Sequence, residues 1–117
     1  MIRIALAAAA AASLAFAAAA QASTPVLKGE VGPGFTIEVK QGGKDVKFLK
    51  AGTYKLVVQD KASIHNFHLI GPGLNKVVTS VPFIGTKTVT VTLKKGKYTY
   101  QCDPHAASGM KGTFKVL

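Results

Sequence analysis

The side chains best suited to bind a soft metal ion are concentrated near the C-terminus of this 117-residue chain. Cys102, His105 and Met110 lie within a stretch of nine residues, in a chain with one cysteine and three histidines. The other two histidines, His65 and His68, lie upstream. A thiolate, imidazoles and a thioether together suit copper, above all with two histidines, one cysteine and a weakly bound axial methionine. The residue types and their spacing therefore predict a mononuclear copper site.

Taken singly, these residues have ordinary structural roles. A lone cysteine is most often a small buried hydrophobic residue, and a methionine often fills a gap in a core. Their concentration in one short segment argues against coincidence. The single cysteine also excludes an intramolecular disulfide and a multi-cysteine zinc site, and it cannot hold an iron–sulfur cluster by itself.

The elements that must position these residues are strands. Apolar and polar residues alternate with a period of two, and turns rich in glycine, proline or lysine separate the alternating segments. The predicted strands cover residues 26–31, 35–40, 54–58, 64–70, 88–93, 97–102 and 113–116. Residues 75–86 are expected to form a loop with a short strand. This pattern predicts an all-β fold, an antiparallel β-sandwich with Greek-key connections.

Residues 1–22 have the design of a secretory signal peptide. Arg3 provides a positive start, residues 4–20 are apolar with one serine, and residues 20–22 read Ala-Gln-Ala, a small-x-small cleavage site. A transmembrane anchor fits less well, because alanine is weakly apolar and no stop-transfer charges follow. We therefore expect a periplasmic or secreted protein whose mature form, residues 23–117, is one domain.

The mature chain is strongly basic. Without Arg3, the formal net charge of +10 becomes +9. Scattered lysines usually serve solubility, but a field of this sign would also attract an acidic redox partner or, weakly, an anionic membrane surface. Nucleic acid is not an expected partner, because the leader exports the protein and no groove-reading helix is present. We expect a monomer.

The segment around the cysteine resembles a known family. The motif runs Cys102-x-Pro104-His105-x3-Gly109-Met110-x-Gly112. It resembles the ligand loop of the plastocyanin-type cupredoxins, the small blue copper proteins. His65-Asn66 resembles the upstream ligand histidine of that family and the asparagine that follows it. The similarity extends from about residue 35 to residue 117, and its C-terminal third is the most specific part.

The resemblance implies a Greek-key sandwich that binds one copper ion and shuttles single electrons. The ligands it implies are His65, Cys102, His105 and Met110. Asn66 would form a hydrogen bond near the cysteine strand and hold the two loops together. The chain departs from plant-type plastocyanin in its basic charge, in the lack of an acidic run and in a second upstream histidine.

Strand alternation favours His65 over His68 as the upstream ligand. Neighbouring side chains on a strand point to opposite faces, so His65 shares a face with the core residues Phe67 and Leu69. His68 would then point toward solvent. A β-bulge near this point would reverse the assignment.

These features predict an electron carrier and not an enzyme. No paired carboxylates and no serine–histidine–aspartate set are apparent. A cysteine hydrolase using Cys102 and His105 would need an oxyanion site, for which the sequence has no glycine-rich signature, and would leave Met110 without a role. A copper delivery or sequestration protein remains the alternative. Because His105 lies among small apolar residues, its edge is the expected route for the electron.

Overall fold

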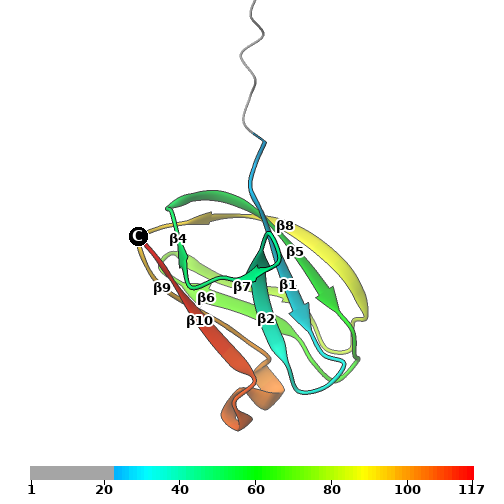
Figure 1. Ribbon diagram of the computed structural model, residues 1–117. Helices are drawn as coiled ribbons and strands as arrows, with labels where there is room; N and C mark the ends of the chain where they lie inside the picture. The colour runs from blue at the N-terminus through cyan, green and yellow to red at the C-terminus, as the bar shows by residue number, and fades with distance from the viewer. Residues whose placement is uncertain (1–22) are drawn as a thin grey trace, which may run out of the picture.

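Ten strands and one short helix make up the part of the chain that the computed structural model describes, residues 23–117 (Figure 1). The first sheet has the order β3 (Lys44–Asp45), β2 (Ile37–Gln41), β1 (Val26–Val31), β5 (Gly52–Asp60) and β8 (Gly85–Leu93). The second has the order β4 (Phe48–Leu49), β10 (Lys111–Val116), β9 (Gly96–Gln101), β6 (Phe67–Gly71) and β7 (Leu74–Thr79). The predicted signal peptide, residues 1–22, lies outside the described residues.

The core lies between the two sheets, as the period of two predicts. On β5, Tyr54, Leu56 and Val58 are buried while most of the residues between them are more exposed. On the second sheet, Tyr98 stacks on Phe114 with ring centroids 5.4 Å apart. Alternate side chains of a strand fall on one face, so both sheets direct an apolar face inward. The predicted all-β sandwich is confirmed.

The strands pair in both directions, whereas a purely antiparallel sandwich was predicted. Strand β1 pairs in parallel with β5, and β4 pairs in parallel with β10. Every other pair between these strands is antiparallel. The connection from β1 to β5 passes through β4 in the other sheet, which brings two strands of the same direction side by side. Both sheets are therefore mixed.

Several boundaries differ from those predicted. Strand β6 begins at Phe67, so residues 64–66 precede the strand that was expected to include them. Residues 75–86 hold most of β7 and the start of β8. Strands β3 and β4 were not predicted, because two residues are too few to show a period of two.

The helix follows the cysteine. It is a 3₁₀ helix, η1 (Asp103–Ser108), in the segment predicted as a plain loop between two strands. Among residues 23–117, no helix has the length and apolar character needed to cross a membrane.

Candidate metal centre

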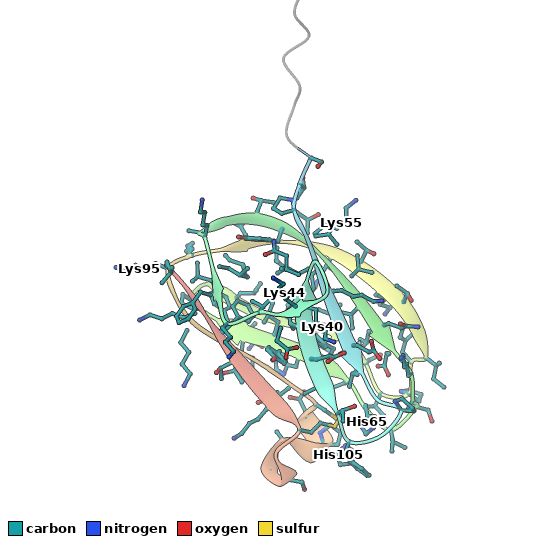
Figure 2. All side chains as sticks on the ribbon, viewed as in Figure 1. Lys40, Lys44, Lys55, His65, Lys95 and His105 are labelled. Atoms are coloured by element: carbon teal, nitrogen blue, oxygen red, sulfur yellow. The ribbon has the colours of Figure 1, made fainter. Side chains whose placement is uncertain are left out.

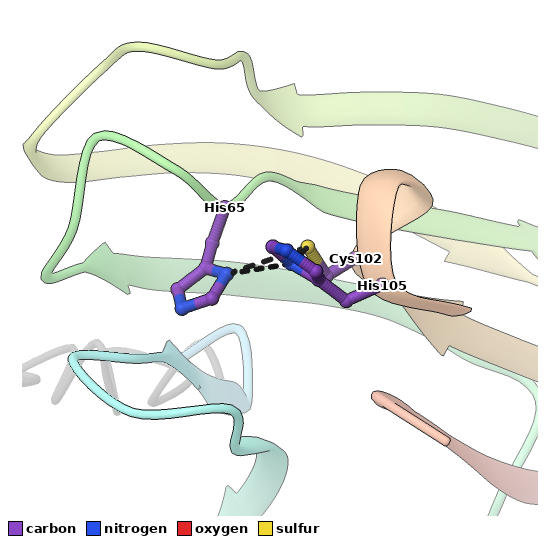
Figure 3. Close-up of side chains that lie close together, drawn as sticks. All are labelled: His65, Cys102 and His105. Carbon is purple, nitrogen blue, oxygen red and sulfur yellow. Dashed lines mark hydrogen bonds between the residues drawn. The ribbon is translucent and has the colours of Figure 1, made fainter. Parts of the chain in front are cut away.

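Three potential metal-binding atoms converge at one end of the sandwich (Figures 2 and 3). Nδ1 of His65 lies 3.1 Å from Nδ1 of His105 and 3.6 Å from Sγ of Cys102. Sγ of Cys102 lies 3.3 Å from Nδ1 of His105. Within residues 23–117, these three form the one group of three or more His, Cys, Asp or Glu side chains close enough to share an ion. The structure thus brings together three of the four predicted site residues by their donor atoms.

The downstream residues are positioned by the end of β9 and by η1. Cys102 follows β9 directly, and its carbonyl accepts a hydrogen bond from the amide of His105 at 3.1 Å. The amide of Met110 donates to the carbonyl of His105 at 3.2 Å, and the amide of Cys102 donates to the carbonyl of Met110 at 3.1 Å. These bonds close the segment into a ring of backbone contacts. Met110, the fourth predicted residue, is therefore held beside the other loop residues.

Gly109 makes the end of this helix possible. Its φ of 94° lies in the left-handed region, which glycine adopts without steric cost. The amide of Gly109 donates to the carbonyl of Ala106 at 3.0 Å. The turn reverses the chain so that Met110 can enter the core before β10 begins.

His65 comes from the other side, on the loop between β5 and β6. Its amide lies 3.5 Å from the carbonyl of Ala62, in a turn that starts at the end of β5. Gly32, just after β1, leaves room for the imidazole, because a Cβ at that position would lie 2.9 Å from Cδ2 of His65. His65 thus occupies a space between the ends of β1 and β5, and strand alternation does not determine its direction.

Burial differs among the site residues. His65 and Cys102 are fully buried and Met110 is 3% exposed, whereas His105 is only half buried. Nε2 of His65 is buried without a hydrogen-bond partner in the described part of the chain. An Nδ1 directed at a shared ion would leave that Nε2 as the protonated nitrogen of the ring. His105 is the histidine that reaches the surface.

Asp103, the residue after Cys102, anchors the ligand loop to the start of β6. The side-chain amide of Asn66 donates to Oδ2 of Asp103 at 2.9 Å, and its Oδ1 accepts the amide of Asp103 at 2.7 Å. The side-chain amide of Gln101 donates to Oδ1 of Asp103 at 2.8 Å. Burial by itself raises the pKa of the Asp103 carboxyl, but the hydrogen bonds from Gln101, Asn66 and His68 hold it below its usual value. The predicted link from Asn66 to the cysteine segment is present.

His68 does not join the three converging side chains. Its Nδ1 lies 2.9 Å from Oδ1 of Asp103, and its Nε2 is hydrogen-bonded to Asn75. The ring faces away from the core as predicted, but it is half buried and bonded, where a solvent-directed side chain was expected. The pairing of β6 with β7 shifts register between Phe67 and His68 without turning His68 inward. The bulge that could have exchanged the two histidines therefore does not do so.

Phe35 is a site neighbour that the sequence analysis did not identify. Its ring meets the rings of His65 and His105 edge to face, at centroid distances of 5.5 and 4.9 Å. Phe35 is 67% exposed, because it lies in the turn between β1 and β2. In the sequence it is only the first residue of an alternating segment, and nothing local relates it to His65 and His105, which lie 30 and 70 positions away.

The chemistry and spacing of the donors fit a copper ion. Metal bonds of about 2.0 Å to nitrogen and about 2.3 Å to sulfur place the donors of one shell roughly 3–4 Å apart. The three observed separations fall in that range. Two imidazoles and one thiolate are the in-plane set of a blue copper site.

Comparison with known proteins assigns the family. Residues 7–117 match the family described as copper binding proteins, plastocyanin/azurin family. This chain therefore belongs to that family, as the resemblance of the ligand loop predicted, and its cofactor is copper. Comparison with curated protein sequences gives no match.

Solved structures of similar fold include rusticyanin, which is described as a copper protein, and auracyanin. Rusticyanin from Thiobacillus ferrooxidans is 25% identical with a TM-score of 0.55, over 82% of this chain and 79% of that chain. Reduced rusticyanin is 26% identical with a TM-score of 0.58, over 82% and 81%. Dithionite-reduced auracyanin from the photosynthetic bacterium Roseiflexus castenholzii is 18% identical with a TM-score of 0.56, over 82% and 99%, which supports the fold alone.

Proposed function

We propose that this protein is an exported one-electron carrier with a single type 1 copper ion bound by His65, Cys102, His105 and Met110. The observation that carries the proposal is the convergence of three donor atoms: Nδ1 of His65, Sγ of Cys102 and Nδ1 of His105. They come from two loops and are buried or half buried. Those loops are fixed by the ends of the sheets and by backbone hydrogen bonds.

The surroundings of the site suit rapid electron transfer. When bound, copper supplies the Cu(II)/Cu(I) couple. The chain holds its donors on rigid elements, so they need to move little between the two oxidation states. His65 and Cys102 are closed to solvent, while the ring of His105 reaches the surface. His105 is therefore the route by which an electron enters and leaves.

One similar protein supports an electron-carrying role, since rusticyanin has been described in a reduced state. Copper delivery is the competing role, and it requires ready release of the ion. The full burial of His65 and Cys102 favours a resident ion over one that is handed on.

The partner we propose is an acidic redox protein in the periplasm or outside the cell. The leader-like composition of residues 1–22 supports export, and the net charge of +9 on the mature chain supports an acidic partner. The end of the sandwich with the proposed copper site also presents His105 and the exposed ring of Phe35. A partner would therefore contact the protein at that end.

The decisive test is the visible spectrum of the mature protein with Cu(II). Binding by a thiolate should give an intense thiolate-to-copper band. Cys102→Ser should abolish the band, because an alcohol does not supply that charge transfer. The far-ultraviolet circular dichroism of the variant should stay that of a β protein. Uptake of copper without colour by the wild type would contradict the proposed site.

A further inference from the structure

His68 makes two side-chain contacts that copper binding does not require. Its Nδ1 lies 2.9 Å from Oδ1 of Asp103, and its Nε2 is hydrogen-bonded to Oδ1 of Asn75. Asp103 directly follows Cys102, whereas Asn75 lies on β7, the edge strand of the second sheet. The imidazole thus bridges the ligand loop and the sheet edge.

The Asp103 carboxylate receives hydrogen bonds from three side chains. Asn66 donates to Oδ2 and Gln101 to Oδ1, while Nδ1 of His68 lies 2.9 and 3.1 Å from the two oxygens. Of these three donors, only the imidazole can carry a positive charge. Both partners of His68 accept hydrogen bonds, so the doubly protonated ring satisfies both at once.

The geometry points to His68 as a positioning residue that holds the Asp103 carboxylate against β6 and so raises the reduction potential of copper bound at Cys102. This inference rests on the proposed function. A carboxylate next to the thiolate ligand places negative charge near the metal, which favours Cu(II). An imidazole bonded to that carboxylate offsets its charge, and this favours Cu(I).

A purely structural role for His68 is the competing explanation. In that case its half-buried ring would serve packing alone. Ile70 provides a matched control, because it lies two residues further along β6 on the same outward face and is also half buried. Ile70→Ala removes packing from that face and leaves Asp103 with its partners.

The first measurement is voltammetry of the copper-loaded protein. His68→Leu should lower the reduction potential while the visible band is kept, because the carboxylate loses its cationic partner. His68→Gln, which can still donate a hydrogen bond but carries no charge, should give an intermediate shift. Ile70→Ala should leave the potential unchanged. An unchanged potential in His68→Leu, or an equal shift in Ile70→Ala, would overturn the inference.

A double-mutant cycle tests whether the effect acts through Asp103. Asp103→Asn should raise the potential by removing the negative charge. In that background, His68→Leu should shift the potential much less than in the wild type. Equal shifts in both backgrounds would show that His68 acts without Asp103 and would overturn the positioning role.

The copper-free protein provides an independent readout. The Asp103 amide is bonded to Asn66, and its hydrogen exchange should accelerate several-fold in His68→Leu but not in Ile70→Ala. Unchanged exchange in the folded His68→Leu and His68→Gln variants would overturn the positioning role by itself. A wild type that binds no copper would contradict the proposed function instead, so the two failures are distinguishable. If His68→Leu does not fold, His68→Gln carries both measurements.

Discussion

Among the four proposed ligands, solvent exposure separates one from the rest. His65, Cys102 and Met110 are buried, and His105 meets the surface beside the ring of Phe35. Burial of the thiolate and of one imidazole would keep water from a bound copper ion. In the electron carrier that we propose, the exposed imidazole would provide a short path to a partner.

Met110→Leu should keep the copper and its colour but raise the reduction potential. A thioether donates weakly to Cu(II), and replacing it with an alkyl group removes that donation and makes the site more apolar. Both changes favour Cu(I). Voltammetry of the two proteins measures the difference, and an equal or lower potential in the variant would argue that Met110 is not an axial ligand.

His65→Gly should open the copper shell and distort the visible spectrum. Added imidazole should restore the spectrum by filling the place of the missing ring. The matched variant, His68→Gly, should keep its colour, because His68 contacts Asp103 and not the converging donors. Loss of colour in His68→Gly together with its survival in His65→Gly would reverse the assignment of the upstream ligand.

At the scale of elements, the site joins segments from both sheets. Cys102 directly follows β9, His105 lies on η1, and His65 lies on the loop that leaves β5. Asp103 links η1 to His68 on β6, and the other ring nitrogen of His68 is bonded to Asn75 on β7. These contacts tie the ligand loop to the sandwich, so its stability should depend on the charge of the groups involved.

The copper-free protein should lose stability as pH rises through neutrality. Burial alone lowers the pKa of His68, but the hydrogen bonds to Asn75 and Asp103 and the charge of Asp103 raise it above its ordinary value of 6.5. A raised pKa in the folded state contributes stability that is fully present below 6.5 and is lost as pH rises through the folded value.

Urea unfolding at a series of pH values measures this loss. His68→Gln should flatten that part of the pH dependence. A wild type and variant with the same slope above pH 6.5 would show that His68 contributes no charge-dependent stability.

At the scale of the whole molecule, part of the positive charge lies far from the proposed copper site. Lys55 and Lys95 lie toward the end of the sandwich away from His65 and His105 (Figure 2). Lys95 belongs to the hairpin between β8 and β9, so that hairpin lies away from the proposed copper site.

Electron exchange with an acidic redox protein should slow as salt rises. Attraction by the lysines speeds the encounter, and ions screen it over about 10 Å at 0.1 M ionic strength. Stopped-flow rates at low and moderate salt measure the effect. A neutral small-molecule reductant serves as the control, since its rate should stay flat. A flat rate with the acidic protein as well would mean that the lysines serve solubility only.

The sequence by itself determined the class of fold and the chemistry of the site. A period of two is a local property, so the strands at residues 88–93 and 97–102 could be predicted from their own residues. The cysteine, histidine and methionine of the loop are likewise close in sequence. Any strand-and-turn arrangement keeps such residues near one another. Their sulfur and imidazole groups are soft or borderline ligands, which indicated copper without a structure.

Only the tertiary structure decided what reaches the site from elsewhere. Phe35 and His65 meet His105 of η1, and Gly32 lies against His65, because the two sheets stack. No local sequence pattern predicts that stacking. Strand alternation favoured His65 as the upstream ligand, and the structure places His65 beside Cys102 and His105, yet the argument assumed a strand where the structure has a loop. The role of His68 depends on contacts to β7 and to Asp103, which lies 35 positions away in the chain. Such contacts follow from the packing of distant segments, and packing is what the sequence pattern alone leaves open.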